Sequence, residues 1–400
     1  MEGARTRGQK ASLESVAAMI RGRAPHAILL VGPEGVGKTT LALDLAAGLL
    51  CEAQPAARPC RVCRACRMVD KGGHPDLHRL GPVGPGRQVI IGGPEARFRG
   101  VRELIGELAL MPVEGGARVA IVECADRMNE DAQAALLKTL EEPPANVVIV
   151  LCAALEDRLL PTVRSRCSRI RLGLVGSRDI EAIVAELDLA DPPLAARLGR
   201  LAGGRPGLAL AYARAPEAVL IRAELSRVLL DLTGARAAAR LAAVRAAIPR
   251  AIAMSAALTT PGDGETASPA RRRRGTTRVV PAVVAPGVTD GPAQDAEDAD
   301  EGRATAVPPA ERRRAAEILL SLWMEIARDV SLVGVGGGRS VRDPVLLEEL
   351  MTVAASIEPG SAAGFLERVA RAGELLASNV SPELLLDSLA LAWPGRTAAA

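Results

Sequence analysis

A glycine-rich loop with one lysine and one threonine carries the clearest chemistry in this chain. Residues 32–39 read Gly-Pro-Glu-Gly-Val-Gly-Lys-Thr, which matches the phosphate-binding pattern G-x-x-x-x-G-K-T. An apolar stretch, Ala27–Val31, precedes the loop, and an apolar helical stretch, Thr39–Leu50, follows it. Glycines let backbone N–H groups turn toward phosphate oxygens, and the helix N-terminus adds partial positive charge. The alternative is a glycine-rich turn before a core helix.

The pattern therefore predicts a site for ATP or ADP with Mg²⁺. In such a site Lys38 reaches the outer phosphates and the Thr39 hydroxyl holds magnesium. The backbone cradle is made by Gly32, Gly35 and Gly37.

Four cysteines form a second candidate site, because Cys51, Cys60, Cys63 and Cys66 lie within sixteen residues. Tetrahedral Zn²⁺ takes four thiolates from tight turns, and two overlapping C-x-x-C units supply them. All four positions would be filled by protein, so such a site is structural. An iron–sulfur cluster or a set of unligated cysteines are the alternatives. The nearby His74 and His78 are interpreted as surface or core histidines.

A third feature concerns hydrolysis. The apolar stretch 119–122 ends in Glu123 and Cys124, where a P-loop ATPase places an aspartate for magnesium and a glutamate for the attacking water. Glu123 thus occupies the metal-side position, and a thiol at 124 replaces the water-activating carboxylate poorly. The strand expected at 147–152 leads into alanines rather than a polar γ-phosphate sensor. We expect nucleotide binding with little or no hydrolysis, unless Asp126 substitutes for the missing carboxylate.

Composition narrows the function classes. Of 400 residues, 48% are hydrophobic but only 1% are aromatic, so base-stacking platforms for single strands are essentially absent. The net charge of +3 does not require a nucleic-acid partner and does not exclude a local basic patch. The N-terminal residues do not resemble a signal peptide, and no uninterrupted apolar run approaches 18 residues. We expect a cytoplasmic protein with no membrane contact, where reducing conditions favour metal over disulfides.

The chain divides into three parts by pattern. Residues 1–172 alternate short apolar strands and helices, which predicts an α/β domain with a parallel sheet and the zinc module at 51–66. Residues 173–215 predict a small helical domain. Residues 216–400 predict an all-helical domain, interrupted by a disordered insertion at 259–311 that is rich in Pro, Gly and charge blocks. The arginine run 271–274 in that insertion is interpreted as part of a solvated linker, with phosphate contact as the alternative.

Arg166 lies in a Ser-Arg-Cys triplet after the third expected strand and a short helix. An arginine at such an edge can reach a neighbouring subunit's nucleotide and stabilise transition-state charge. From the local sequence alone, a surface arginine in an ion pair is the simpler interpretation.

Several motifs together resemble the AAA+ clamp-loader family of bacterial DNA polymerase III. They are Gly8-Gln9, His26-Ala27-Ile28-Leu29-Leu30, the four-cysteine spacing, the run Ala135–Pro144 (Ala-Leu-Leu-Lys-Thr-Leu-Glu-Glu-Pro-Pro) and Ser165-Arg166-Cys167. The family implies an AAA+ P-loop domain with a parallel sheet, a helical lid and a helical collar.

Within that family, further features resemble the delta-prime branch rather than the ATP-hydrolysing gamma/tau branch. They are His74-Pro75-Asp76-Leu77-His78, the missing catalytic glutamate, Gly203–Leu210 with Gly207 where the motor carries a phosphate-sensing arginine, Ala327–Val330 and Asn379–Leu384. The resemblance covers nearly the whole chain except 259–311.

The resemblance implies a member of a hetero-pentameric ring with gamma/tau motor subunits and a delta subunit. The ring loads the sliding clamp onto primer-template DNA during replication. Arg166 would be the trans-acting arginine finger, and the polymerase activity belongs to another subunit. A gamma/tau-type ATPase motor is the main alternative, and a zinc-bearing nucleic-acid-binding P-loop protein is a second.

Overall fold

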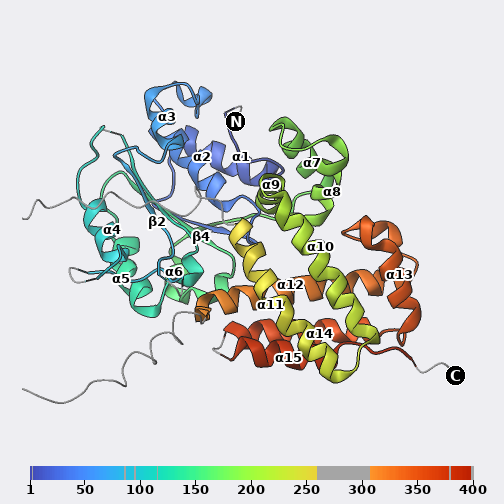
Figure 1. Cartoon of the computed structure of the whole chain (residues 1–400). Helices are drawn as coiled ribbons and strands as arrows, with labels where there is room; N and C mark the ends of the chain where they lie inside the picture. Colours follow the sequence, from blue (N-terminus) through green and yellow to red (C-terminus); the bar gives the residue numbers. More distant parts are fainter. Residues whose placement is uncertain are drawn as a thin grey trace, which may run out of the picture.

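A parallel sheet and two groups of helices make up the structure, a computed structural model that describes residues 1, 3–84, 87–93, 96–114, 116–258, 307–377 and 380–397 (Figure 1). The five strands pair in the order β2-β3-β4-β1-β5, and all named pairs are parallel. Their bounds are β1 Ala27–Val31, β2 Leu77–Leu80, β3 Arg118–Val122, β4 Val147–Ala153 and β5 Ser168–Arg171. The prediction of an α/β domain with a parallel sheet is confirmed.

Helices cover both faces of this sheet. They are α1 Lys10–Arg21, α2 Lys38–Leu50, α3 Arg64–Asp70, α4 Val101–Leu108, α5 Glu130–Glu141 and α6 Pro161–Ser165. Alternate strand residues enter two different cores: Ile28 packs in the cluster that includes α1 and α2, while Leu29 packs in the cluster that includes α4 and α5. Because the side-chain period of a strand is two, a strand buried on both faces must be apolar at every position.

The sequence does not predict strands β2 and β5, whose apolar patterns are weak. Strand β2 has only two apolar residues, since it reads Leu-His-Arg-Leu, and β5 reads Ser-Arg-Ile-Arg. Helices α1 and α3 were not predicted either. The expected strands at 27–31, 119–123 and 147–152 agree with β1, β3 and β4 to within one residue at each end.

The chain after β5 is helical throughout its described part. A first group, here called the lid helices, comprises α7 Ser177–Glu186, α8 Pro192–Leu201 and α9 Pro206–Arg214. A second group, the collar helices, comprises α10 Pro216–Asp231, α11 Ala237–Leu258, α12 Pro309–Gly334, α13 Leu347–Ser356, α14 Ser361–Ala377 and α15 Pro382–Ala392. Both groups share one continuous apolar core, and Trp323, Phe365 and Trp393 stack edge-to-face within it.

Most of the predicted insertion lies outside the described residues, which stop at 258 and resume at 307. Helix α12 begins at Pro309, so its first turn falls within the stretch 259–311 that the sequence assigned to the insertion. Proline suits the first helical position, because its missing N–H has no helical partner there anyway.

Among the described helices, α11 alone is long and apolar enough, by length and composition, to span a membrane. Core helices of folded domains pass the same test. One face of α11 packs in the shared helical core, and the buried Arg240 donates to the Trp393 carbonyl oxygen at 2.6 Å.

A buried ion network joins the lid helices to the collar helices. Glu325 on α12 accepts from Arg222 of α10 at 2.7 Å, and it also pairs with Arg205 at the start of α9. Asp343 accepts from Arg197 of α8 at 2.9 Å. Arg222, Glu325 and Asp343 are all less than a tenth exposed, so each charge depends on its partners.

We expect Glu325→Gln to lower the free energy of unfolding by about 3 kcal/mol, because it leaves Arg222 buried with a weakened counter-charge. Chemical unfolding followed by circular dichroism would measure the loss. The matched control is Glu349→Gln, because Glu349 pairs with Arg227, whose side chain is 47% exposed. This substitution should change the free energy of unfolding by less than about 0.5 kcal/mol. Equal effects of the two substitutions would contradict the importance of this network.

Candidate nucleotide and metal sites

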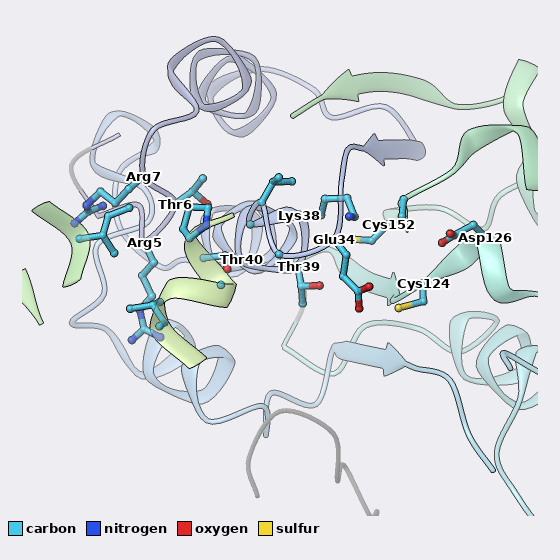
Figure 2. Close-up of a pocket in the computed structure, with 18 of the residues that line it drawn as sticks. Arg5, Thr6, Arg7, Glu34, Lys38, Thr39, Thr40, Cys124, Asp126 and Cys152 are labelled. Carbon is cyan, nitrogen blue, oxygen red and sulfur yellow. The ribbon is translucent and has the colours of Figure 1, made fainter. Parts of the chain in front are cut away.

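The predicted phosphate loop lies in a cavity of about 340 Å³ between the sheet and the lid helices (Figure 2). The loop connects β1 to α2, and Gly37 sits at the N-cap of α2 with φ of 103°. Gly35 also has a positive φ, 79°, which side-chain-bearing residues adopt only with strain. No side chain caps α2, so its first N–H groups remain available to an anion.

Lys38 points along this loop. Its ammonium group donates to the carbonyl oxygens of Gly32 at 2.6 Å and Pro33 at 2.8 Å. Burial lowers the pKa of Lys38, while nearby acidic groups, among them Cys152 and Asp126, oppose that shift. A half-buried ammonium with only carbonyl partners is suited to phosphate oxygens, which would compensate its charge. The residues present therefore fit a nucleotide.

The residues expected to act on the γ-phosphate are only partly brought together. Cys124 and Asp126 line the cavity, and so does Ala154. Glu123 does not: its carboxylate accepts from Arg79 of β2 at 2.6 and 2.9 Å. A metal-side role for Glu123 would require it to leave this ion pair.

Cys124, which the sequence pattern places at the water-activating position, has an unusual backbone conformation. Its φ is 52°, in the left-handed region, immediately after β3. Burial raises the pKa of the Cys124 thiol, so the group is protonated at neutral pH and cannot accept a proton from water.

The family resemblance indicates one further wall of the cavity, the lid at Gly207, whereas the other was not predicted from the sequence. The lid approaches closely, because the Gly207 N–H donates to the Gly35 carbonyl at 2.9 Å, and a Cβ at 207 would lie 3.1 Å from that oxygen. The N-terminal segment Arg5–Arg7 forms the other wall. Figure 2 shows Arg5, Thr6 and Arg7 at one end of the cavity and Cys124 and Asp126 at the other, with Lys38 between. Nothing in the spacing of residues 5–7 signals this position.

The four predicted metal ligands converge. The Sγ atoms of Cys51, Cys60, Cys63 and Cys66 all lie within 4.8 Å of one another, and Cys51 Sγ lies 3.5 Å from Cys60 Sγ and 3.9 Å from Cys63 Sγ. Tetrahedral thiolates on Zn²⁺ would be about 3.8 Å apart. Among the described residues, neither His74 nor His78 belongs to the cluster.

The electrostatics of the cluster also suit a cation. N–H groups of Val62 and Cys63 lower the pKa of Cys60 to about 6. Burial raises the pKa values of Cys51 and Cys66, so four thiolates need a bound positive charge to coexist. The cluster can therefore hold a metal ion.

The residues His74, Asp76 and His78 have structural roles. Asp76 is fully buried and accepts from the N–H groups of Val113 and Glu114. Burial alone would raise the pKa of Asp76, but those two N–H groups and the Arg118 guanidinium hold it below its usual value. Both histidines pair with glutamates, His74 with Glu114 at 3.3 Å and His78 with Glu107 at 2.8 Å.

Arg166 lies outside its own chain's cavity. It follows α6, is about one-third exposed, and pairs with Glu141 of α5 at 2.5 Å. It also donates to the Thr162 carbonyl at 2.9 Å. Burial raises the pKa of the neighbouring Cys167 to about 11, so this thiol stays protonated at neutral pH, and its side chain packs at the edge of the core cluster that includes α4 and α5.

The strand order, the loop after β1 and the helical lid define the class: a P-loop nucleotide-binding fold of the AAA+ type. Residues 8–175 match the family model described as "DNA polymerase III, delta subunit". Over this region the chain is similar to proteins of that family and to subunits named DNA polymerase III subunit delta'.

Two curated relatives and one solved structure illustrate the similarity. DNA polymerase III subunit delta' of Pseudomonas aeruginosa is 38% identical over 46% of this chain and 55% of that protein. DNA polymerase III subunit tau of Salmonella typhimurium is 33% identical over 44% of this chain and 27% of that protein. The match thus spans about half the length of the delta' relative. A DNA polymerase III gamma subunit-related protein from Thermotoga maritima superposes over 95% of this chain and 97% of that chain, at 16% identity and a TM-score of 0.38, which is too loose to carry an argument.

We expect the purified chain to contain one tightly bound metal ion and Cys66→Ser to lose it, because three thiolates bind far more weakly than four. Elemental analysis of protein purified without added metal would measure the content. Cys167→Ser is the matched control and should keep a full equivalent. Retention of the metal by Cys66→Ser would contradict the four-thiolate site.

Proposed function

We propose that this chain is a delta-prime-like subunit of the DNA polymerase III clamp loader, which binds nucleotide without hydrolysing it and presents Arg166 to the nucleotide of a neighbouring motor subunit. The observation that carries the proposal is the combination of the family match with a cavity that keeps the phosphate loop and has a protonated thiol, Cys124, at the water-activating position.

Loss of hydrolysis follows from the chemistry of that cavity. A general base must reach the attacking water and accept its proton. Cys124 cannot accept the proton, and Glu123 is held by Arg79. When bound, Mg²⁺ would neutralise phosphate charge, and Thr39 is the residue of this chain placed to hold it. Lys38 and the Gly35–Gly37 backbone would bind the phosphates.

The trans role of Arg166 is supported by its placement. The side chain lies outside the cavity of its own chain and is partly exposed, so an adjacent subunit can contact it. Its guanidinium pairs with Glu141 at the end of α5, a side chain that is itself about half exposed. Arginine supplied from a neighbour in this way stabilises the charge that develops on a transferring phosphoryl group.

The remaining assignments accompany this proposal. The cluster Cys51, Cys60, Cys63 and Cys66 would hold Zn²⁺, which supplies a structural cross-link and takes no part in a reaction. Residues 1–172, 173–215 and 216–400 would be the nucleotide-binding, lid and collar domains. The partners would be gamma/tau and delta subunits in a hetero-pentamer in the cytoplasm, with the sliding clamp and primer-template DNA reached through the complex.

A gamma/tau-type motor is the second candidate. The similarity to tau relatives favours it, and Asp126 lines the cavity close to Cys124. Asp126 would have to supply the missing base, although its carboxylate already accepts from the Leu155 N–H at 3.4 Å.

We expect the isolated chain to bind ADP and ATP but to turn over no ATP in the steady state. Lys38→Ala should weaken nucleotide binding by about 10- to 100-fold, because it removes charge-assisted hydrogen bonds worth about 1.5–3 kcal/mol. Calorimetry would measure affinity, with Lys71→Ala, an exposed lysine after α3, as the control. Sustained hydrolysis that Asp126→Asn abolishes would instead support the motor.

In a ring reconstituted with tau and delta subunits, we expect Arg166→Ala to remove the DNA- and clamp-stimulated hydrolysis of the one site that receives this arginine. An arginine finger is worth about 10³-fold or more in rate at its site. Arg164→Ala is the matched control, since Arg164 lies in α6, two residues before Arg166, and pairs with the exposed Asp157.

Gel filtration must show that each variant ring is assembled. An unchanged rate in an assembled Arg166→Ala ring would remove the finger assignment. A wild-type chain that fails to join the ring would overturn the clamp-loader proposal itself.

A further inference from the structure

A fully buried aspartate in the middle of α2 is unexplained by nucleotide or metal binding alone. Asp44 has no exposed surface. Its carboxylate accepts from the backbone N–H of Arg5 at 2.9 Å and of Thr6 at 2.8 Å, and it forms an ion pair with Arg61. A buried carboxylate is tolerated only with such partners. Asp44 therefore fixes the N-terminal segment against α2.

The charge partner of Asp44 belongs to the cysteine cluster. Arg61 lies directly after Cys60 and two residues before Cys63, with a left-handed φ of 58°. Its guanidinium also donates to Asp70 of α3 at 2.6 Å and to the Gly3 carbonyl at 2.8 Å. The side chain thus holds three separate segments together from within the cluster.

The contacts of Arg5, Asp44, Arg61 and Asp70 form a closed network. Asp70 accepts from the Arg5 side chain at 2.8 Å as well as from Arg61, while the Arg5 backbone N–H donates to Asp44. Arg5 and Thr6 in turn line the nucleotide cavity. One continuous set of hydrogen bonds and ion pairs therefore connects the turn between two thiolates to a wall of the nucleotide cavity.

We propose that Arg61 and Asp44 are positioning residues that couple occupancy of the four-cysteine site to nucleotide affinity. A bound metal orders the backbone on both sides of Arg61. The ordered guanidinium compensates the charge of Asp44, and Asp44 holds Arg5 and Thr6 at the cavity wall. Loss of the metal frees Arg61, loosens the N-terminal segment and weakens nucleotide binding. The coupling is reciprocal, so bound nucleotide slows metal release. This inference rests on the proposed nucleotide site.

Two readouts on the full-length chain test the coupling. Amide hydrogen exchange follows the Arg5 and Thr6 N–H groups, which report the Asp44 contact without any nucleotide, and calorimetry follows ADP affinity. Both are measured on the metal-loaded protein, on chelator-treated protein, and on Arg61→Ala. Arg64→Ala is the matched control, because Arg64 lies in the same cluster but pairs with Glu114, away from Asp44. Arg61→Lys keeps the positive charge but cannot contact Asp44, Asp70 and the Gly3 carbonyl at once. It replaces Arg61→Ala in both measurements if Arg61→Ala does not fold.

We expect chelation and Arg61→Ala each to speed exchange at Arg5 and Thr6 by at least about tenfold and to weaken ADP binding by about 5- to 100-fold. Arg64→Ala should leave both unchanged. Unchanged exchange and affinity after metal removal and in Arg61→Ala or Arg61→Lys would overturn the coupling. Absence of ADP binding by the metal-loaded wild type would instead remove the proposed nucleotide site, and the exchange data would still decide whether the cluster holds the N-terminal segment.

Discussion

A single buried helix, α2, is the constraint on which both candidate sites depend. Its thirteen residues span about 20 Å, with the phosphate loop at its N-terminus and Cys51 immediately after its C-terminus. One face is packed without exposure against β1, β3 and β4 through residues such as Leu41 and Leu45. Since the helix cannot shift without disturbing that core, the positions of the phosphate loop and of the first thiolate are set together.

The cavity at the start of α2 is lined by the phosphate loop and by a thiol, Cys124, which underlies the proposal of binding without hydrolysis. Lys38 and the glycine backbone provide positive charge and N–H donors, whereas the thiol of Cys124 and the alanine at 154 provide neither a base nor a phosphate sensor. Binding and hydrolysis use different chemistry, so a P-loop protein can lose the second and keep the first. In the proposed function, a nucleotide held in this way would stabilise the folded state by mass action.

The lid helices contact the phosphate loop on one side and the collar region on the other. Gly207 donates directly to the phosphate loop, while Arg197 and Arg205 pair with Asp343 and Glu325 of the collar region. These charges are mostly buried, so moving the lid helices away from the collar region requires breaking several ion pairs at once. These contacts fix the lid helices against both the phosphate loop and the collar helices. Arg166, directly after α6 at another part of the sheet domain, pairs with Glu141 and the Thr162 carbonyl rather than with the lid.

The sequence by itself determined the local features: the phosphate loop, the four-cysteine spacing, the replacement of a catalytic carboxylate by Cys124, the parallel α/β pattern and the helical remainder. Each depends on residues close together in the chain, whose spacing sets their geometry. The tertiary structure alone decided which distant residues meet. Glu123 pairs with Arg79, Arg5 and Thr6 form a wall of the cavity, and Asp44 meets Arg61, because strand pairing and core packing bring together segments whose separation in sequence carries no signal. Short strands such as β2 escaped prediction for the same reason, since they are stabilised by their neighbours in the sheet rather than by their own pattern.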